Sequence, residues 1–148
     1  MQSYSYLMSN TGVAGHYVEL SEARLKELLV QVLALVDVDE VWYLQTYADV
    51  AEAVRAGAMQ SAGAHYRIAG YFENRLPYPV QVDEAWYLQT YPDVAAALRA
   101  GAFASGQQHF ERNGYQEGRL PRADWSLLGG SVGQRLSPAG ASRRAGGS

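Results

Sequence analysis

The stretch VDEVWYLQTY at residues 38–47 returns as VDEAWYLQTY at residues 82–91, 44 residues later. The alignment continues without a gap, so that residues 38–77 match residues 82–121. About 25 of the 40 aligned positions are identical, and self-similarity at a fixed period is the signature of an internal duplication. The chain of 148 residues is therefore organised around two copies of one unit.

Each copy carries the signals of three short helices. Residues that favour the N-cap position precede the three helical patterns, and a glycine follows the second helix and ends the third. Helices this short are marginal in isolation, so they must be stabilised by packing on one another. The predicted N-caps are Asp39, Asp49 and Ser61 in the first copy and Asp83, Asp93 and Ser105 in the second, and the glycines are Gly57, Gly70, Gly101 and Gly114.

A longer amphipathic helix is predicted over residues 21–36, with Ser21 as its N-cap. A helix that is apolar on more than one side favours burial on more than one side. It is either central to its own domain, or it also pairs with a second subunit and makes the protein a homo-oligomer. The apolar stripe is Leu25, Leu28, Leu29, Val32, Leu33 and Val36, widened by Val30 and Leu35.

These patterns predict an all-α fold of two tandem three-helix repeats preceded by one longer helix. The single helical domain spans residues 21–128, with the repeats at 38–77 and 82–121. Residues 1–20 are predicted to be an irregular segment with a short strand at 17–20. Residues 129–148 form a Gly/Ser/Arg tail with too little apolar surface to fold, so we expect disorder there. Trp125 is expected to dock on the helical body.

The composition narrows the classes of function. The chain has no cysteine, which excludes disulfides and thiolate metal sites. Its net charge of −3 argues against nucleic acid as a partner. No apolar run reaches the ~20 residues that a membrane span needs, and the N-terminus does not resemble a secretory signal. We expect a cytoplasmic protein, with leaderless export to a cell surface or a particle as the alternative.

Few residues suit catalysis. His65 and His109 occupy equivalent positions, and a structural histidine held by a neighbouring turn is favoured over a metal ligand or a general base. Residues 37–39 have the form of an Asp-x-Asp metal motif, but Asp39 is already explained as a helix cap. No phosphate-binding loop or nucleophile elbow occurs. The sequence therefore predicts no enzyme, no cofactor and no metal site.

Aromatic residues recur at matched positions and are the candidates for ligand binding. Eleven tyrosines are more than a core easily accommodates, because each buried hydroxyl needs a partner. Rings at the surface beside polar groups suit stacking on sugars and contacts with proteins. Arg75 and Arg119 follow Glu73 and Glu117, which favours a structural role, either an ion pair or a bond from the arginine to the carbonyls that end the third helix. A polar lip around a ligand is the alternative. The predicted ligand-binding residues are Trp42, Tyr43, Tyr47, Tyr71, Arg75, Trp86, Tyr87, Tyr91, Tyr115 and Arg119.

Both copies follow the pattern Val-Asp-Glu-x-Trp-Tyr-Leu-x-x-Tyr-Pro-Asp-Val-Ala, then Ser, His-Phe/Tyr, Gly-Tyr and Glu-x-Arg-Leu-Pro. The match is closest at residues 82–121, whereas the first copy has Ala48 in place of the proline. This pattern resembles a short module of bacterial polysaccharide-biosynthesis proteins, where it flanks glycosyltransferase domains, and of secreted or surface repeat proteins. The resemblance covers 80 of the 148 residues and implies a polysaccharide context.

The sequence thus predicts a non-enzymatic binding or adaptor module. Its partner would be a bacterial polysaccharide, or a protein of polysaccharide synthesis or surface assembly, recognised through repeated aromatic patches. The alternative is a structural subunit or scaffold that acts by protein–protein contacts and oligomerisation.

Overall fold

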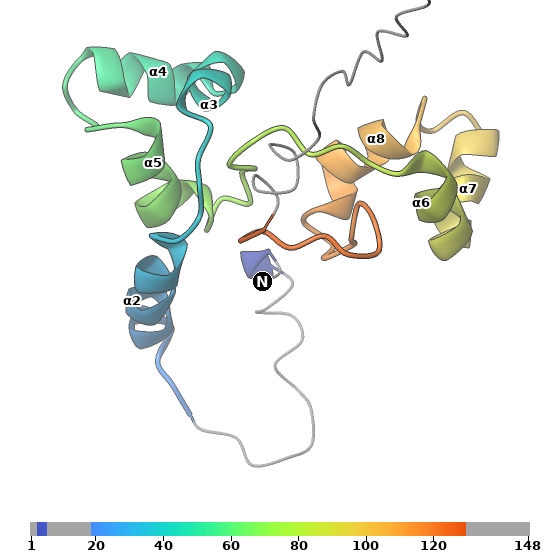
Figure 1. Ribbon diagram of the computed structural model, residues 1–148, viewed down its shortest axis with the longest axis horizontal. Coiled ribbons are helices and arrows are strands. Elements are labelled where there is room, and N and C mark those ends of the chain that lie inside the picture. The colour runs from blue at the N-terminus through green and yellow to red at the C-terminus, as the bar shows by residue number, and fades with distance from the viewer. Residues whose placement is uncertain (1–2, 6–18, 130–148) are drawn as a thin grey trace, which may run out of the picture.

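The computed structural model describes residues 3–5 and 19–129, and this part of the chain consists of helices, turns and loops. The prediction of an all-α fold is confirmed for these residues. Figure 1 shows the two repeats side by side, joined by the segment at residues 78–81, with α2 extending from the first repeat. The elements are α2 (Glu22–Leu33), α3 (Glu40–Thr46), α4 (Ala48–Arg55), α5 (Ala62–His65), η1 (Tyr66–Gly70), α6 (Glu84–Thr90), α7 (Pro92–Arg99), α8 (Gly106–His109) and η2 (Phe110–Gly114).

Every element from α3 to η1 has a counterpart of the same length 44 residues later. The predicted caps of the first and third helices are confirmed. The Asp39 carboxylate accepts a hydrogen bond from the backbone N–H of Trp42 at 3.0 Å, and the Ser61 hydroxyl accepts one from Ala64 at 3.0 Å. Asp83 and Ser105 make the same bonds in the second repeat. Local capping therefore begins these helices where the sequence places them.

The predicted glycine after the second helix is also confirmed. Gly57 has φ +73°, and the equivalent Gly101 has φ +78°. The N–H of Gly57 bonds the carbonyl of Val54, and the N–H of Ala58 bonds the carbonyl of Ala53. This pair of bonds is a Schellman motif, which needs a left-handed residue at the helix end and so favours glycine.

The predicted role of Asp49 and Asp93 as N-caps is wrong. Helix α4 begins at Ala48, and its N-cap is Tyr47, whose side chain makes no capping bond. Asp49 lies within the first turn, where a carboxylate is favoured by the helix dipole. Its carboxylate also forms an ion pair with Arg75 at 2.7 Å, so a long-range partner adds to the favourable position at the start of the helix. Asp93 is placed in the same way in α7, with Arg119 as its partner.

The third helix of each repeat widens into a π-helix, which the sequence does not predict. The N–H of Tyr71 bonds the carbonyl of Tyr66 at 2.9 Å, a spacing of five residues. Gly70 ends this segment as predicted, and it does so beside the hydroxyl of Tyr43. A Cβ atom at residue 70 would collide with that hydroxyl, so a buried ring decides the need for glycine here.

Helix α2 is shorter than predicted. It begins with Ser21 as N-cap, as expected, but ends at Leu33 and not at Val36. The N–H of Val36 bonds the carbonyl of Leu33 in a tighter turn, and both side chains are buried against the first repeat. Burial of Val36 after a turn is a tertiary effect, which helical periodicity does not detect. Part of the predicted stripe remains exposed, at Leu28, Val32 and Leu35.

The junction between the repeats is closed by the segment that follows the second one. Trp125 docks as predicted, with its ring centroid 6.3 Å from those of both Phe110 and Tyr115. The hydroxyl of Tyr78, in the linker, donates to the carbonyl of Leu127 at 2.9 Å. Residues from the linker and the C-terminal segment therefore share one core with the second repeat.

Residues 3–5 bridge the ends of the two repeats. The Ser3 hydroxyl donates to the carbonyl of Gln116 at 3.4 Å, and the Ser5 N–H donates to the Asn74 side chain at 3.2 Å. Asn74 has φ +58° and the equivalent Gly118 has φ +75°, so both repeats turn through the left-handed region there. Contact with both repeats gives this short segment a defined position.

Several expectations fall partly on residues that the structure does not describe. The predicted strand at 17–20 is not seen at Glu19 and Leu20, which lie in neither helix nor strand, while residues 17 and 18 lie outside the described ranges. The predicted disorder of the tail concerns residues 130–148, which also lie outside them, as does His16.

Candidate functional site

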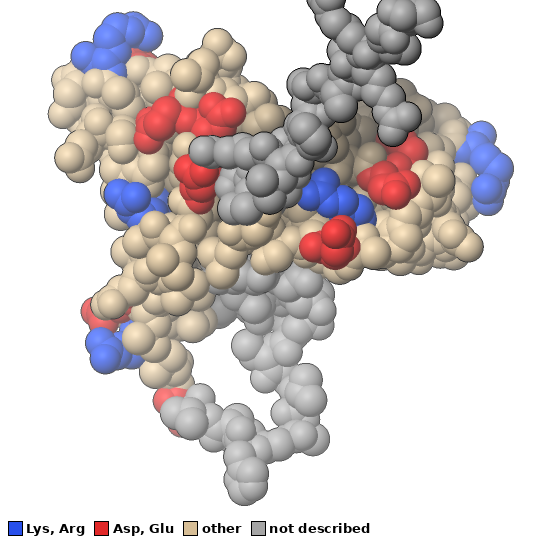
Figure 2. All heavy atoms as spheres, in the orientation of Figure 1, with Lys and Arg blue, Asp and Glu red and all other residues tan. Residues whose placement is uncertain are grey.

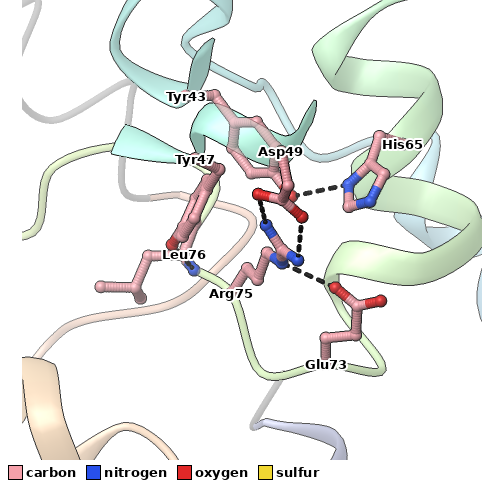
Figure 3. A network of polar contacts seen from close by, with 7 residues as sticks. All are labelled: Tyr43, Tyr47, Asp49, His65, Glu73, Arg75 and Leu76. Atoms are coloured by element: carbon pink, nitrogen blue, oxygen red, sulfur yellow. Dashed lines mark hydrogen bonds and ion pairs between the residues drawn. The ribbon is translucent and has the colours of Figure 1, made fainter. Parts of the chain in front are cut away.

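Each repeat is held together by a buried tyrosine–histidine pair. The Tyr43 hydroxyl and Nδ1 of His65 lie 3.1 Å apart, and both side chains are buried (Figure 3). Burial lowers the pKa of His65, which favours the neutral imidazole. Tyr87 and His109 form the same pair at 3.0 Å. The predicted structural role of the histidines fits this geometry, although the partner is a tyrosine and not a turn.

Arg75 forms ion pairs with two carboxylates of its own repeat. Its guanidinium donates two hydrogen bonds to Asp49, at 2.9 and 2.7 Å, and one to Glu73 at 2.6 Å. It also lies 4.9 Å from the ring centroid of Tyr47 (Figure 3). The bidentate bond to Arg75 lowers the pKa of Asp49 to about 2. The predicted pair with Glu73 is thus present and extends to a second carboxylate, and Arg119 repeats the arrangement.

Two further side chains stabilise the backbone of the repeat. The Tyr47 hydroxyl accepts a hydrogen bond from the N–H of Leu76 at 2.9 Å. The Glu40 carboxylate accepts from the N–H groups of Ala62 and Gly63, at 2.8 and 2.9 Å, and so caps α5 from outside. Tyr91 and Glu84 bond the equivalent groups of the second repeat. Most polar groups that recur at matched positions are therefore used to fold each repeat.

The structure narrows the predicted set of ligand-binding residues. Tyr43, Tyr71, Tyr87 and Tyr115 are buried in the core, so their rings do not face solvent as that prediction requires. The two arginines are held by carboxylates of their own repeats, as described above. Three hydrogen bonds to two carboxylates hold each guanidinium in place and balance its charge within the repeat. Four half-buried rings of the set remain, and they are Trp42, Tyr47, Trp86 and Tyr91.

A cleft of about 440 Å³ lies between the repeats and includes two of these rings. Its volume is within the range of roughly 300–1,000 Å³ that is typical of small-molecule sites. Both rings of the lining come from the first repeat, and most of its polar side chains come from the linker and the second repeat. The lining residues are Trp42, Thr46, Tyr47 and Leu76 from the first repeat, Pro79, Val80 and Gln81 from the linker, and Gln107 and Glu111 from the second repeat.

Gln107 holds the far wall of the cleft in place. Its amide nitrogen donates to the carbonyl of Val80 and to the carboxylate of Glu111, both at 2.7 Å. Its amide oxygen accepts from the N–H of Val82 at 2.8 Å. These three bonds tie the linker to α8 and orient the Glu111 side chain. The first repeat has Gly63 at the equivalent position, which has no side chain to form these three bonds.

Four polar lining residues were missed as binding residues from the sequence: Thr46, Gln81, Gln107 and Glu111. The last two differ between the repeats, because Gly63 and Arg67 occupy the matching positions of the first. Residues that recur in both copies mark the shared fold. A polar residue present in one copy only is the signal that could have indicated the cleft.

Comparison with known proteins adds no assignment: no protein-family model, no curated protein and no solved structure matches this chain. Within residues 3–5 and 19–129, no group of three or more His, Asp or Glu side chains is placed to hold a metal ion. In the same part of the chain, no helix has the length and apolar character to cross a membrane.

Charges on the surface do not form a nucleic-acid interface on the face shown in Figure 2. Acidic and basic side chains are interspersed there, without one continuous basic area. A protein that binds the phosphate backbone usually gathers Lys and Arg on one face. The cleft, which combines two rings with amide and carboxylate side chains, is therefore the stronger candidate for a binding site.

Proposed function

We propose that this protein is a non-enzymatic binding module that holds a segment of bacterial polysaccharide in the cleft between its repeats. One observation carries the proposal. Trp42 and Tyr47 line one side of a cavity of about 440 Å³, and hydrogen-bonding side chains of the linker and the second repeat line the other.

The chemistry of this lining suits a sugar ring. A pyranose has an apolar face of C–H groups and an edge of hydroxyls, so it needs an aromatic surface on one side and hydrogen-bonding groups on the other. Trp42 and Tyr47 supply the first, and Gln81 and Glu111 supply the second. Ligand sites commonly combine a largely apolar lining with a few placed polar groups.

The resemblance of residues 38–77 and 82–121 to a module of polysaccharide-biosynthesis and surface proteins supports a saccharide over other small ligands. A polymer also explains why a binding site would lie between repeats and remain open, because a chain must enter and leave. No residue pair in the cleft forms a nucleophile–base arrangement, so binding without reaction is the simplest role.

Calorimetric titration with oligosaccharides prepared from dextran, alginate and chitosan tests the proposal. We expect saturable binding to at least one, with quenching of tryptophan fluorescence. Trp42→Ala should weaken binding about tenfold, as loss of a central aromatic contact does. Trp86→Ala is the matched control, because Trp86 has the same place in the second repeat but does not line the cleft. Binding to none of the panel, or equal effects of both substitutions, would overturn the proposal.

A second function, as a scaffold subunit acting through protein–protein contacts, is favoured by the exposed face of α2. Leu28 is 46% exposed, Val32 is 39% exposed and Leu35 is 72% exposed. Leu28 and Val32 are four residues apart and so share one side of α2, and Leu35 lies in the turn that follows the helix. Light scattering across a dilution series distinguishes the two roles. An oligomer that dissociates in the variant Leu28→Gln/Leu35→Gln supports the scaffold, and a monomer at all concentrations contradicts it.

A further inference from the structure

We propose that Glu111 makes the cleft selective for sugars that donate hydrogen bonds, through hydroxyl or ammonium groups, and excludes sugars that carry a carboxylate. This inference rests on the proposed function, because it names the class of saccharide that the same cleft would bind. Glu111 is the one Asp, Glu, Lys or Arg among the residues that line the cleft.

The Glu111 carboxylate is held in place but not saturated. Its Oε1 accepts one hydrogen bond, from the Gln107 amide at 2.7 Å. A carboxylate offers about four acceptor sites, so most of its capacity remains for a ligand. Gln107 donates its amide protons to Val80 and Glu111 and accepts from Val82. It therefore positions the carboxylate and has no amide proton left to donate to a ligand.

The nearest cation of the first repeat cannot reverse this selectivity. Arg75 is adjacent in sequence to Leu76, which lines the cleft, but its guanidinium is bonded to Asp49 and Glu73. Its side chain is 20% exposed. A ligand carboxylate that approached Arg75 would meet the two carboxylates already paired with it, and it would also approach the charge of Glu111. An ammonium or hydroxyl group would instead form a charge-assisted bond with Glu111.

The duplication strengthens the assignment. The first repeat has Arg67 at the position equivalent to Glu111, and Gly63 at that of Gln107. Glu111 and Gln107 therefore occur together in the second repeat, where both line the cleft. The first repeat lacks both residues, and its matching segment does not line the cleft. A general requirement of the fold would place similar residues at both positions.

Titration with three β-1,4-linked tetramers, of glucose, glucosamine and glucuronic acid, tests the inference by changing one charge per ring on a constant backbone. We expect the glucuronic acid tetramer to bind the wild-type protein about tenfold more weakly than the glucose tetramer at low salt. The gap should shrink at higher salt, because screening weakens exposed charges. The glucosamine tetramer should bind at least as tightly as the glucose tetramer.

Substitutions then assign the effect to one residue. Glu111→Gln should bring the affinities for the glucose and glucuronic acid tetramers within about twofold, and Glu111→Arg should invert the preference. Glu52→Gln removes the same charge from an exposed position on α4 and should leave the gap unchanged. Circular dichroism confirms that each variant is folded.

The outcomes separate this inference from the proposed function. If a wider panel contains a binding oligosaccharide but its acidic derivative binds the wild type as tightly as its neutral form, the charge selectivity is wrong and the binding function stands. A gap that persists in Glu111→Gln also overturns the inference. If no oligosaccharide of the panel binds, the proposed function fails and the inference fails with it.

Discussion

The first repeat supplies rings to the cleft, whereas the second supplies an amide and a carboxylate, although both descend from one sequence. The rings are shared, since Trp86 and Tyr91 match Trp42 and Tyr47. The polar wall is not, since Gly63 and Arg67 occupy the places of Gln107 and Glu111. The side chains that bond within each copy are thus largely retained in both, and the polar side chains that the second repeat adds to the cleft are not.

This comparison shows how a duplicated unit can acquire a site. Each copy closes on itself, since the N–H of Asp39 bonds the carbonyl of Pro77 and the N–H of Asp83 bonds that of Pro121, both at 3.0 Å. A self-contained fold leaves the facing surfaces free to change independently. The following substitutions compare the two copies, beginning with the largest expected effect.

Replacement of the central tyrosine should have the largest effect. Tyr43→Ala and Tyr87→Ala each remove a fully buried ring, at a cost of about 3–5 kcal/mol of unfolding free energy. Urea unfolding monitored by circular dichroism measures the loss. Equal losses are expected if the two copies are equivalent folding units. A loss below about 1 kcal/mol for either variant would contradict its placement in the core.

Gly70→Ala and Gly114→Ala should follow. Each added methyl group collides with the hydroxyl of the tyrosine that bonds the histidine, and overpacking of this kind costs about 1–3 kcal/mol. The same urea experiment measures the change. Gly57→Ala is a useful contrast, because the space around Gly57 is open and only its φ of +73° opposes a side chain. If Gly70→Ala left the free energy of unfolding unchanged while Gly114→Ala lowered it, Tyr43 would not lie as close to residue 70 as in this structure.

Tyr66 and Phe110 occupy equivalent core positions, and substituting each by the other's residue type should affect the stability of the two copies differently. The Tyr66 hydroxyl is buried and forms no well-aligned hydrogen bond. It lies near the Tyr115 hydroxyl, and the two groups shift each other's pKa. Tyr66→Phe should therefore change the free energy of unfolding by no more than about 1 kcal/mol.

The reverse substitution is the control. Phe110→Tyr adds a hydroxyl to a buried position and should cost about 1–3 kcal/mol. Thermal or urea unfolding of both variants measures the difference. A large destabilisation by Tyr66→Phe would indicate that a buried water or another group bonds this hydroxyl. The surroundings of the two positions would then differ as well as their side chains.

The smallest effect concerns acid pH. Pairing with Arg75 holds the pKa of Asp49 at about 2, and pairing with Arg119 lowers that of Asp93. Because the folded-state pKa lies below the unfolded value, the stabilisation is complete above pH ~4 and is lost as pH falls toward about 2. Both carboxylates are exposed to solvent, so each pair should contribute less than about 1 kcal/mol.

Urea midpoints measured from pH 5 to pH 2 test this expectation. The midpoint of the wild type should fall more steeply below pH 4 than that of Asp49→Asn, and high salt should reduce the difference. Asp93→Asn offers the matching measurement in the second repeat. Identical pH profiles for the wild type and both variants would show that the ion pairs contribute nothing to stability.

The sequence by itself determined the 44-residue period, the all-α fold and the helix ends at Asp39, Ser61 and Gly57. These features depend on bonds between residues a few positions apart, which a local pattern records. It also singled out the aromatic set and the pairing of Glu73 with Arg75.

Only the tertiary structure decided how those residues are used. Tyr43 is buried and Trp42 lines the cleft, although they are neighbours, because the packing of α3 against α4 and α5 selects one side of the helix. Asp49, at the start of α4, bonds Arg75, which lies 26 residues away in the sequence. The cleft itself belongs to neither copy, since its walls come from both, and no local pattern describes how two units face each other.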